Sequence, residues 1–267
     1  MIGKKFNKYD RYGAYHYRAF QNLPFKDLQT YTRYLNVYIL LKEYLKIKSK
    51  NFFILIDVGC GDGALLYFLK KIKGLDFYAI GVDTSLNGLI LAKKMLSNEH
   101  LVDLVQADAT HLPIKHGCID VVTLLEVIEH EAKYEQLLYE IKCALKSGSM
   151  ILLTTPNAKF YGPKDQYHVK EFTAEEIQAL CKKYFACCWA FGSWSLSLQN
   201  LIFRIETCYN WSNSYSIRKL LDFIHKLINF INYLFFSKLC LDPDKAFTLV
   251  IVGLQGKCGI SNQNHKF

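Results

Sequence analysis

The chain has 267 residues, of which 51% are apolar and 21% are charged, and it carries a formal net charge of +9. This composition is sufficient for one α/β domain with a good hydrophobic core and some additions. The nine cysteines form no C-x-x-C pair, which disfavours a disulfide scaffold or a zinc site and favours reduced thiols in a cytoplasmic protein. The first residues, MIGKKFNKYDRYG, lack an apolar signal core, so we do not expect secretion.

Most of the positive charge precedes the first predicted strand. Residues 1–50 hold eleven Lys or Arg and three carboxylates, and eight tyrosines between Tyr9 and Tyr44 alternate with these cations. From Asp27 to Ile47 the apolar positions follow helical spacing. The segment is therefore predicted to be a helical cap whose tyrosines pack on the core. Contact with an anionic lipid headgroup, a sugar phosphate or RNA is the alternative.

A buried strand, a glycine-rich turn and a helix are predicted in succession over residues 53–72. The turn contains Gly59, Gly61 and Gly63, and glycines let a backbone pass close to a ligand at the start of a helix. The same glycines fit a dinucleotide fingerprint, which keeps a dehydrogenase as a weaker alternative. Asp57 lies two residues before the first glycine, where a carboxylate would repel a pyrophosphate but suits a cationic amino-acid ligand.

Acidic residues also follow the next three predicted strands, which are residues 76–82 before Asp83, 102–107 before Asp108 and 119–125 before Glu126. Carboxyl ends of strands in an open α/β sheet lie at one edge, where ligands bind. Farther along, the sequence predicts a helix over 133–145, a strand over 150–155, a helix opened by a Thr173 and Glu176 capping box, and strands over 185–191 and 248–254.

This series of motifs resembles class I S-adenosylmethionine-dependent methyltransferases, in particular the methyltransferase type 11 and ubiquinone-pathway O-methyltransferase group, over about residues 50–192 and 248–254. The resemblance implies an α/β, Rossmann-like sheet of seven mostly parallel strands, the seventh antiparallel. It also implies N-terminal helices that close over bound S-adenosyl-L-methionine, with Asp83 on the ribose and Asp108 near the adenine. The implied cofactor-binding residues are Asp57, Gly59, Cys60, Gly61, Asp83, Thr84, Asp108, Ala109, Leu125 and Glu126.

The segment Glu126-Val127-Ile128-Glu129-His130 holds the candidate catalytic residues. If a helix begins near Glu126, Glu126, Glu129 and His130 share one face, and His168 reaches the same sheet edge from the loop after the fifth strand. These four residues are the candidate ligands for Mg²⁺, Mn²⁺ or Zn²⁺. The arrangement resembles the E-x-x-E-H plus distal His set of ubiquinone-pathway O-methyltransferases and RNA 3′-terminal 2′-O-methyltransferases.

Glu129, His130 and His168 are the predicted catalytic residues. Two alternatives to a metal remain, which are metal-free acid–base use of His130 or His168 and a purely structural role. His16 would also reach the site if the N-terminal cap folds over it.

Four regions are predicted, which are a basic helical cap (1–50), the cofactor-binding core (51–194), a helical apolar insertion (195–246) and the last strand with the tail (247–267). Polar residues interrupt the apolar run 220–241, so no transmembrane span is expected. Its broad apolar face suits peripheral membrane contact, a substrate lid or core packing.

The predicted function is O-methylation of a small-molecule, lipid-linked or glycan acceptor. A metal-dependent RNA 2′-O-methyltransferase and a non-catalytic cofactor-binding or membrane-associated protein are the alternatives. The nearly neutral core stands against RNA.

Overall fold

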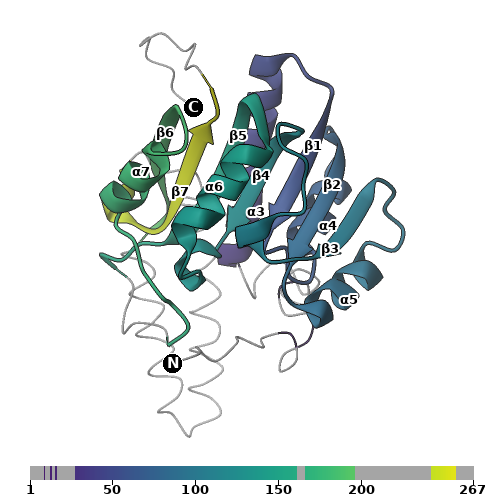
Figure 1. The fold of residues 1–267 in the computed structure, drawn as a ribbon, viewed down its shortest axis with the longest axis horizontal. Coiled ribbons are helices and arrows are strands. Elements are labelled where there is room, and N and C mark those ends of the chain that lie inside the picture. The colour runs from purple at the N-terminus through teal and green to yellow at the C-terminus, as the bar shows by residue number, and fades with distance from the viewer. Residues whose placement is uncertain are drawn as a thin grey trace, which may run out of the picture.

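The computed structural model describes Tyr9, Gly13, His16 and residues 28–160, 166–195 and 242–256. Within these residues the chain forms one seven-stranded sheet in the order β3-β2-β1-β4-β5-β7-β6 (Figure 1). The strands are β1 (Phe52–Val58), β2 (Asp76–Asp83), β3 (Val102–Gln106), β4 (Ile119–Leu125), β5 (Leu145–Pro156), β6 (Cys187–Ser195) and β7 (Ala246–Leu254).

The strand directions put a topological switch in the middle of the sheet. β1 pairs in parallel with β2 on one side and with β4 on the other, so the chain winds outward in both directions from β1. β7 is antiparallel to both β5 and β6. The predicted Rossmann-like sheet with an antiparallel seventh strand is thereby confirmed. Ligands of such sheets bind at the carboxyl ends of the strands beside the switch.

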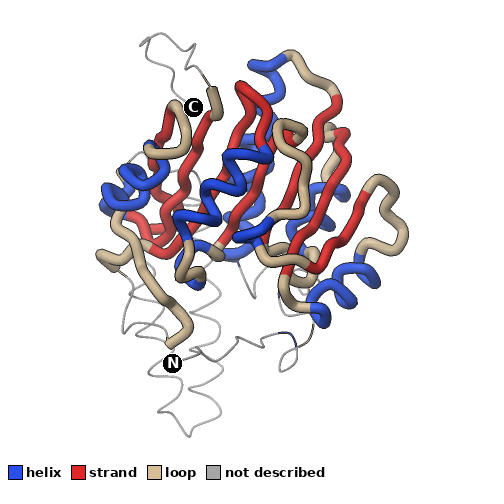
Figure 2. Tube along the Cα trace, viewed as in Figure 1, coloured by secondary structure: helices blue, strands red, loops and turns tan. Residues whose placement is uncertain are grey.

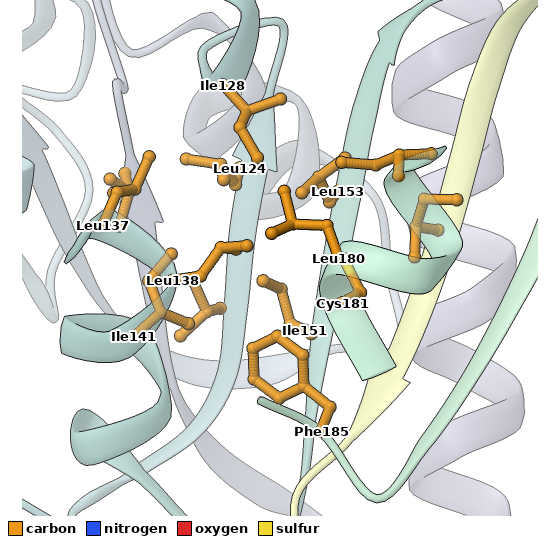
Figure 3. Packing of buried hydrophobic residues seen from close by; sticks show 14 of the residues in the cluster. Leu124, Ile128, Leu137, Leu138, Ile141, Ile151, Leu153, Leu180, Cys181 and Phe185 are labelled. Carbon is orange, nitrogen blue, oxygen red and sulfur yellow. The ribbon is translucent and has the colours of Figure 1, made fainter. Parts of the chain in front are cut away.

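Helices cover both faces of the sheet (Figure 2). They are α3 (Leu28–Lys48), α4 (Ala64–Lys71), α5 (Leu86–Met95), α6 (Tyr134–Ala144) and α7 (Ala174–Lys182). Alternating residues of β1 serve the two layers, because Phe53 and Leu55 pack with α3 and α4 whereas Ile56 and Val58 pack in the layer of α6 and α7. Figure 3 shows the second layer, where Leu138 of α6 and Leu180 of α7 lie over Ile151 of β5.

The N-terminal helix α3 belongs to the packed core. Leu41 is fully buried, and the tyrosines Tyr34 and Tyr44 are 6% exposed. The Asn36 side chain donates a buried 2.8 Å hydrogen bond to the Ser193 hydroxyl of β6. The prediction that tyrosines of this segment pack on the core is confirmed for these two residues.

Element boundaries differ from the predictions by a few residues. β5 begins five residues early, at Leu145, and β6 runs from Cys187 to Ser195 because its whole length pairs with β7. The last of those pairs joins Ser195 to Ala246, so the two ends of the predicted insertion lie side by side. Residues 196–241 of the insertion lie outside the described residues, as does the tail 257–267. None of the helices described in the structure is long and apolar enough to cross a bilayer.

The cysteines divide into two kinds. Five described cysteines are free thiols, and burial raises the pKa of Cys60 and Cys181. Cys187 is disulfide-bonded, so the prediction of reduced thiols throughout is wrong at this residue. The odd count and the scattered spacing gave no indication of a disulfide at Cys187. The cytoplasmic location stays a prediction.

Candidate active site

The glycine-rich turn joins β1 to α4 at the carboxyl edge of the sheet. Gly59, Gly61 and Gly63 all have positive φ angles, of 76°, 54° and 75°, which other residues adopt only at a cost. The Gly59 amide donates to the Val82 carbonyl over 2.7 Å, which fixes the turn against β2. A Cβ atom at Gly59 would lie 2.3 Å from a Val127 methyl group. Both backbone conformation and packing therefore require glycine there.

Asp57 is buried at the carboxyl end of β1. Its Oδ1 atom accepts a 2.7 Å hydrogen bond from the Thr123 hydroxyl on β4. Burial raises the pKa of Asp57 to about 7, although the Thr123 hydrogen bond lowers it. The nearby Asp83 carboxylate adds to the rise. A cationic ligand at this position would restore the charged form.

Asp83 connects the ends of β1 and β2. One carboxylate oxygen accepts from the Gly61 amide at 2.8 Å, and the other accepts from the Ser85 amide at 2.7 Å. Burial raises its pKa, and these backbone hydrogen bonds oppose the rise. The Thr84 amide also donates to this carboxylate, which keeps a lone pair for a ligand hydroxyl. Ser85 in turn caps α5 by accepting from the Gly88 amide.

The other predicted cofactor residues lie on the same edge. Asp108 is exposed and caps a short 3-10 turn, and its hydrogen bonds from the Thr110 amide and hydroxyl lower its pKa. Cys60 is buried in the glycine turn, Thr84 is exposed after β2, Ala109 begins the 3-10 turn, and Leu125 ends β4.

Two N-terminal residues approach the glycine turn. A Cβ atom built on Gly61 would lie 1.7 Å from the Tyr9 hydroxyl oxygen, so the tyrosine rests directly against the turn. Burial raises the pKa of Tyr9, and the carboxylates of Asp62 and Asp83 raise it further. His16 Nδ1 lies 3.7 Å from Asp62 Oδ1. His16 thus lies at the glycine turn, and its reach to the cluster of His130 and His168 stays a prediction.

Glu126 does not begin a helix. Its φ angle is +55°, a conformation that is costly for a residue with a side chain, and only a 3-10 turn over Ile128–His130 follows. One oxygen of Glu126 accepts from the Thr154 hydroxyl at 2.8 Å, and the other lies 3.2 Å from Arg33 of α3. Its inclusion among the candidate metal ligands is corrected, because these contacts direct the carboxylate toward Arg33.

The other three candidate ligands do converge. Potential ligand atoms of Glu129, His130 and His168 all lie within 4.8 Å of one another. The two imidazole centroids are 4.8 Å apart at an angle of 67°. The amides of Val169 and Lys170 both donate to the Glu129 carbonyl, which ties the loop to the 3-10 turn. Backbone hydrogen bonds between the loop and the 3-10 turn, rather than the spacing of residues on a helix, therefore bring these three side chains together.

Hydrogen bonds orient the two imidazoles of this group. His130 Nδ1 lies 3.0 Å from the Tyr167 carbonyl, which only accepts, so Nδ1 carries the proton and Nε2 carries the lone pair in the neutral ring. His168 Nδ1 lies 3.0 Å from Glu171 Oε1, which favours the same tautomer. A carbonyl or a carboxylate behind a ligand histidine is the usual support for metal binding.

Glu129 is buried between these imidazoles and β5. Its Oε2 atom accepts from the Thr155 hydroxyl at 3.1 Å. Burial raises the pKa of Glu129 well above its usual range, and the Glu126 carboxylate adds to this effect. Arg33 opposes the rise. The donor set of one carboxylate and two imidazole nitrogens fits a divalent cation, which would stabilise the charged carboxylate.

A family model described as "Methyltransferase domain" matches residues 56–153. The match runs from β1 to β5 and includes the glycine turn, Asp83 and the Glu129-His130 pair. The chain contains a class I methyltransferase domain. The resemblance stated from the sequence motifs is confirmed.

Curated relatives resemble this methyltransferase domain over part of their length. An uncharacterized protein of Methanocaldococcus jannaschii is 34% identical over 45% of this chain and 46% of its own. The ubiquinone biosynthesis O-methyltransferase of Glaesserella parasuis is 27% identical over 44% of this chain and 53% of its own. The demethylmenaquinone methyltransferase of Staphylococcus saprophyticus is 34% identical over 36% of this chain and 42% of its own. The chain thus spans about half the length of the curated relatives it matches.

Solved structures share the fold of the methyltransferase domain over more of the chain. A possible histamine N-methyltransferase of Thermotoga maritima matches with a TM-score of 0.55 and 17% identity, over 92% of this chain and 97% of its own. The [4+2]-cyclase SpnF matches with a TM-score of 0.55 and 14% identity, over 86% of this chain and 82% of its own. A fold that serves a cyclase in one protein does not by itself define the reaction in another.

Several residues of the methyltransferase domain were missed by the sequence reasoning. Thr123 and Arg33 touch predicted site residues from other elements, whereas Asp62 lies inside the glycine turn and Glu171 lies three residues after His168. Asp62 and Glu171 were detectable in the sequence, since Asp62 is a second acid five residues after Asp57 and Glu171 is a carboxylate next to a predicted site histidine. Thr123 and Arg33 become neighbours of the site only through the fold.

Proposed function

We propose that the protein is an S-adenosyl-L-methionine-dependent methyltransferase that methylates a hydroxyl oxygen of a small-molecule acceptor. The cluster of Glu129, His130 and His168 carries this proposal, because the segments after β4 and β5 bring it to the same sheet edge as Asp57 and Asp83. Lipid-linked and glycan acceptors belong to the proposed class. Cytoplasmic location and membrane contact through 195–246 are parts of the same proposal.

We assign the cofactor to the turn after β1 and to the carboxylates beside it. Asp57 would accept from the cofactor ammonium group, and the remaining lone pair of Asp83 would accept from a ribose hydroxyl. Asp108 lies beyond the end of β3, where it suits the adenine amino group. The bound cofactor supplies an electrophilic methyl group. Tyr9, which rests on Gly61, would cover the turn and exclude water.

Acceptor activation is assigned to the histidine and glutamate cluster. The Nε2 lone pairs of His130 and His168 are set by their Nδ1 partners, so each atom is free of a proton in the neutral ring. With Glu129 they would hold a divalent cation, which lowers the pKa of a bound hydroxyl. Without a cation, His168 or His130 would take the hydroxyl proton as a general base.

The names of relatives support the acceptor class. Sequence relatives include a ubiquinone biosynthesis O-methyltransferase and a demethylmenaquinone methyltransferase. The structure of a Haemonchus contortus phosphoethanolamine N-methyltransferase in complex with S-adenosyl-L-methionine shares the fold, with a TM-score of 0.53 and 19% identity. The match covers 81% of this chain and 53% of the other. The named acceptors are small molecules, which supports a small-molecule acceptor for this chain.

The experiment is an untargeted transfer assay. The protein is incubated with methyl-labelled S-adenosyl-L-methionine and cell extract, and label is measured in small-molecule, lipid, glycan and RNA fractions. We expect label in one of the first three fractions. Label in RNA would transfer the proposal to the RNA 2′-O-methyltransferase class. Cofactor binding without label in any fraction would indicate a non-catalytic binding protein.

A further inference from the structure

A second charged surface lies at the sheet edge opposite the candidate active site. Helices of parallel βαβ units run against the strands, so the end of α3 and the start of β1 both lie at the amino edge, the upper edge in Figure 1. Residues 46–52, from the last turn of α3 to the first residue of β1, are all exposed. We name residues 42–52, 70–76 and 142–146 the amino-edge surface.

This surface is rich in lysine. Its three segments contain nine lysines, two carboxylates and no arginine. Lys50 and Lys146 both bind the buried Asp120, which brings the first and third segments together. Within the part of the chain that the structure describes, no ion pair joins Lys42, Lys46 or Lys48 to a carboxylate. These three lysines keep their charge available to a partner.

Apolar side chains project among the lysines. Ile47 is 60% exposed and Phe52 is 47% exposed, and they flank Lys48 and Lys50 in the α3–β1 connection. Beside them is an open cavity of about 540 Å³, whose lining includes Lys42, Lys46 and Lys50 as well as Glu43, Gly74 and Asp76. Lysines at a helix C-terminus also stabilise the helix dipole, and that effect accounts for Lys46 and Lys48. It does not account for two large apolar side chains held in water at the same edge.

We propose that the amino-edge surface docks the protein on an anionic lipid bilayer. Unpaired lysines are attracted to anionic headgroups, and each contributes about fivefold to membrane partitioning (~1 kcal/mol). Ile47 and Phe52 insert between headgroups, as apolar residues of interfacial segments do. RNA fits less well, because arginine forks and stacked aromatic platforms are lacking in these segments. This orientation turns the opposite edge, with the candidate active site and the two ends of the 195–246 insertion, away from the membrane, so it is an alternative to membrane contact through that insertion.

The lysines are tested by co-sedimentation of the full chain with phosphatidylcholine vesicles that contain 30% phosphatidylserine. The triple variant Lys42→Gln, Lys46→Gln, Lys48→Gln should bind about a hundredfold more weakly than the parent. A control with the same charge loss is Lys159→Gln, Lys182→Gln, Lys183→Gln, which should bind nearly as the parent does. Equal loss in both triple variants would overturn a defined docking surface and leave net charge as the cause.

The apolar contribution has its own pair of variants. Ile47→Ser with Phe52→Ser should weaken vesicle binding about tenfold, whereas the equally exposed pair Ile90→Ser with Tyr139→Ser should leave it unchanged. Circular dichroism melting curves confirm that each variant is folded. The proposal would be refuted if the parent protein did not bind the vesicles. It would also be refuted if the parent bound single-stranded RNA more tightly than vesicles through the same three lysines. The result is independent of the methyl acceptor.

Discussion

Asp57 is fully buried at the end of β1, and this burial raises its pKa to about 7. Because that pKa lies above the ordinary value of 3.8, ionisation of Asp57 destabilises the folded protein. The stability that the protonated form confers is fully present below about pH 4 and is lost as pH rises through 7. A ligand ammonium group would reverse the effect by pairing with the charged carboxylate.

Asp57→Asn should therefore change stability in a pH-dependent way. At pH 8 we expect the variant to be more stable than the parent by at most about 4 kcal/mol, at ~1.4 kcal/mol per pH unit between the two pKa values. Near pH 4 the two proteins should have equal stability. Urea unfolding at both pH values measures the difference. A stability difference that is the same at pH 4 and pH 8 would contradict the assigned pKa.

The affinity for the cofactor product should also depend on the protonation of Asp57. Parent protein should bind S-adenosylhomocysteine about tenfold more tightly at pH 8 than at pH 6, since the ammonium group requires a charged Asp57. Asp57→Asn should bind more weakly and show little dependence on pH. Isothermal titration calorimetry is the measurement, with Asp108→Asn as a control that keeps the pH dependence because Asp108 is exposed and its pKa is already low.

The cluster of Glu129, His130 and His168 is the subject of a further prediction at the residue scale. Glu129→Gln and His168→Ala should each lower turnover by about a thousandfold or more, while cofactor affinity changes only a few fold. Glu171→Gln should weaken binding of Mn²⁺ by about tenfold, because it removes the carboxylate behind His168. Electron paramagnetic resonance of Mn²⁺ measures that affinity. Full activity after exhaustive chelation would exclude the metal and leave a histidine general base.

At the scale of elements, the start of α7 is well defined by its sequence. Thr173 accepts from the Glu176 amide while the Glu176 carboxylate accepts from the Thr173 amide, the reciprocal capping box that the sequence predicts. Ala174 follows directly as the first residue of the helix. Local hydrogen bonds between residues three apart need no tertiary partner, so this prediction was reliable.

Thr173→Ala should lower the free energy of unfolding by about 1 kcal/mol. The loss arises because the Glu176 amide at the helix start is left without its side-chain acceptor. Thr173→Ser keeps the hydroxyl and is the matched control, with an expected change of a few tenths of a kcal/mol. Urea denaturation compares the three proteins. Equal destabilisation by Ser and Ala would point to the methyl group of Thr173 rather than the cap.

The segment after β4 shows where local pattern fails. Spacings of three and four suggested a helix that begins near Glu126, but the chain makes only a 3-10 turn, and α6 begins at Tyr134. Ile128 is fully buried against the layer of α6 and α7, which holds the turn in place. The Glu126 amide donates to the Thr154 carbonyl of the neighbouring β5, so sheet pairing overrides helix formation. Glu129 and His130 still meet His168, through backbone bonds across the loop.

At the scale of the whole molecule, β7 lies between β5 and β6 and completes the sheet. Its pairing with β6 runs from Cys187 opposite Leu254 to Ser195 opposite Ala246. The chain between them therefore leaves and re-enters the sheet at adjacent points. The fold does not require that segment to have any fixed length.

Replacement of residues 197–241 by a six-residue Gly-Ser linker should leave the core folded. With both proteins under reducing conditions, which remove the disulfide of Cys187 from the comparison, we expect a cooperative melting transition within a few degrees of the parent and unchanged affinity for S-adenosylhomocysteine, because β6, β7 and the carboxyl edge keep their contacts. Turnover should be lost if the insertion selects the acceptor. Calorimetry and the transfer assay separate the two effects. A variant that fails to fold would show that the insertion packs on the core.

The sequence alone determined the order of strands and helices along the chain, the glycine turn and the acidic residues at the ends of the first four strands. These features depend on short-range periodicity, backbone conformation and local capping, which neighbouring residues encode. Only the tertiary structure decided the long-range contacts of the site, such as Arg33 with Glu126 and Thr123 with Asp57. It also decided the pKa of Asp57 and the turn at Glu126, because burial and pairing with a neighbouring strand arise from residues far apart in the chain.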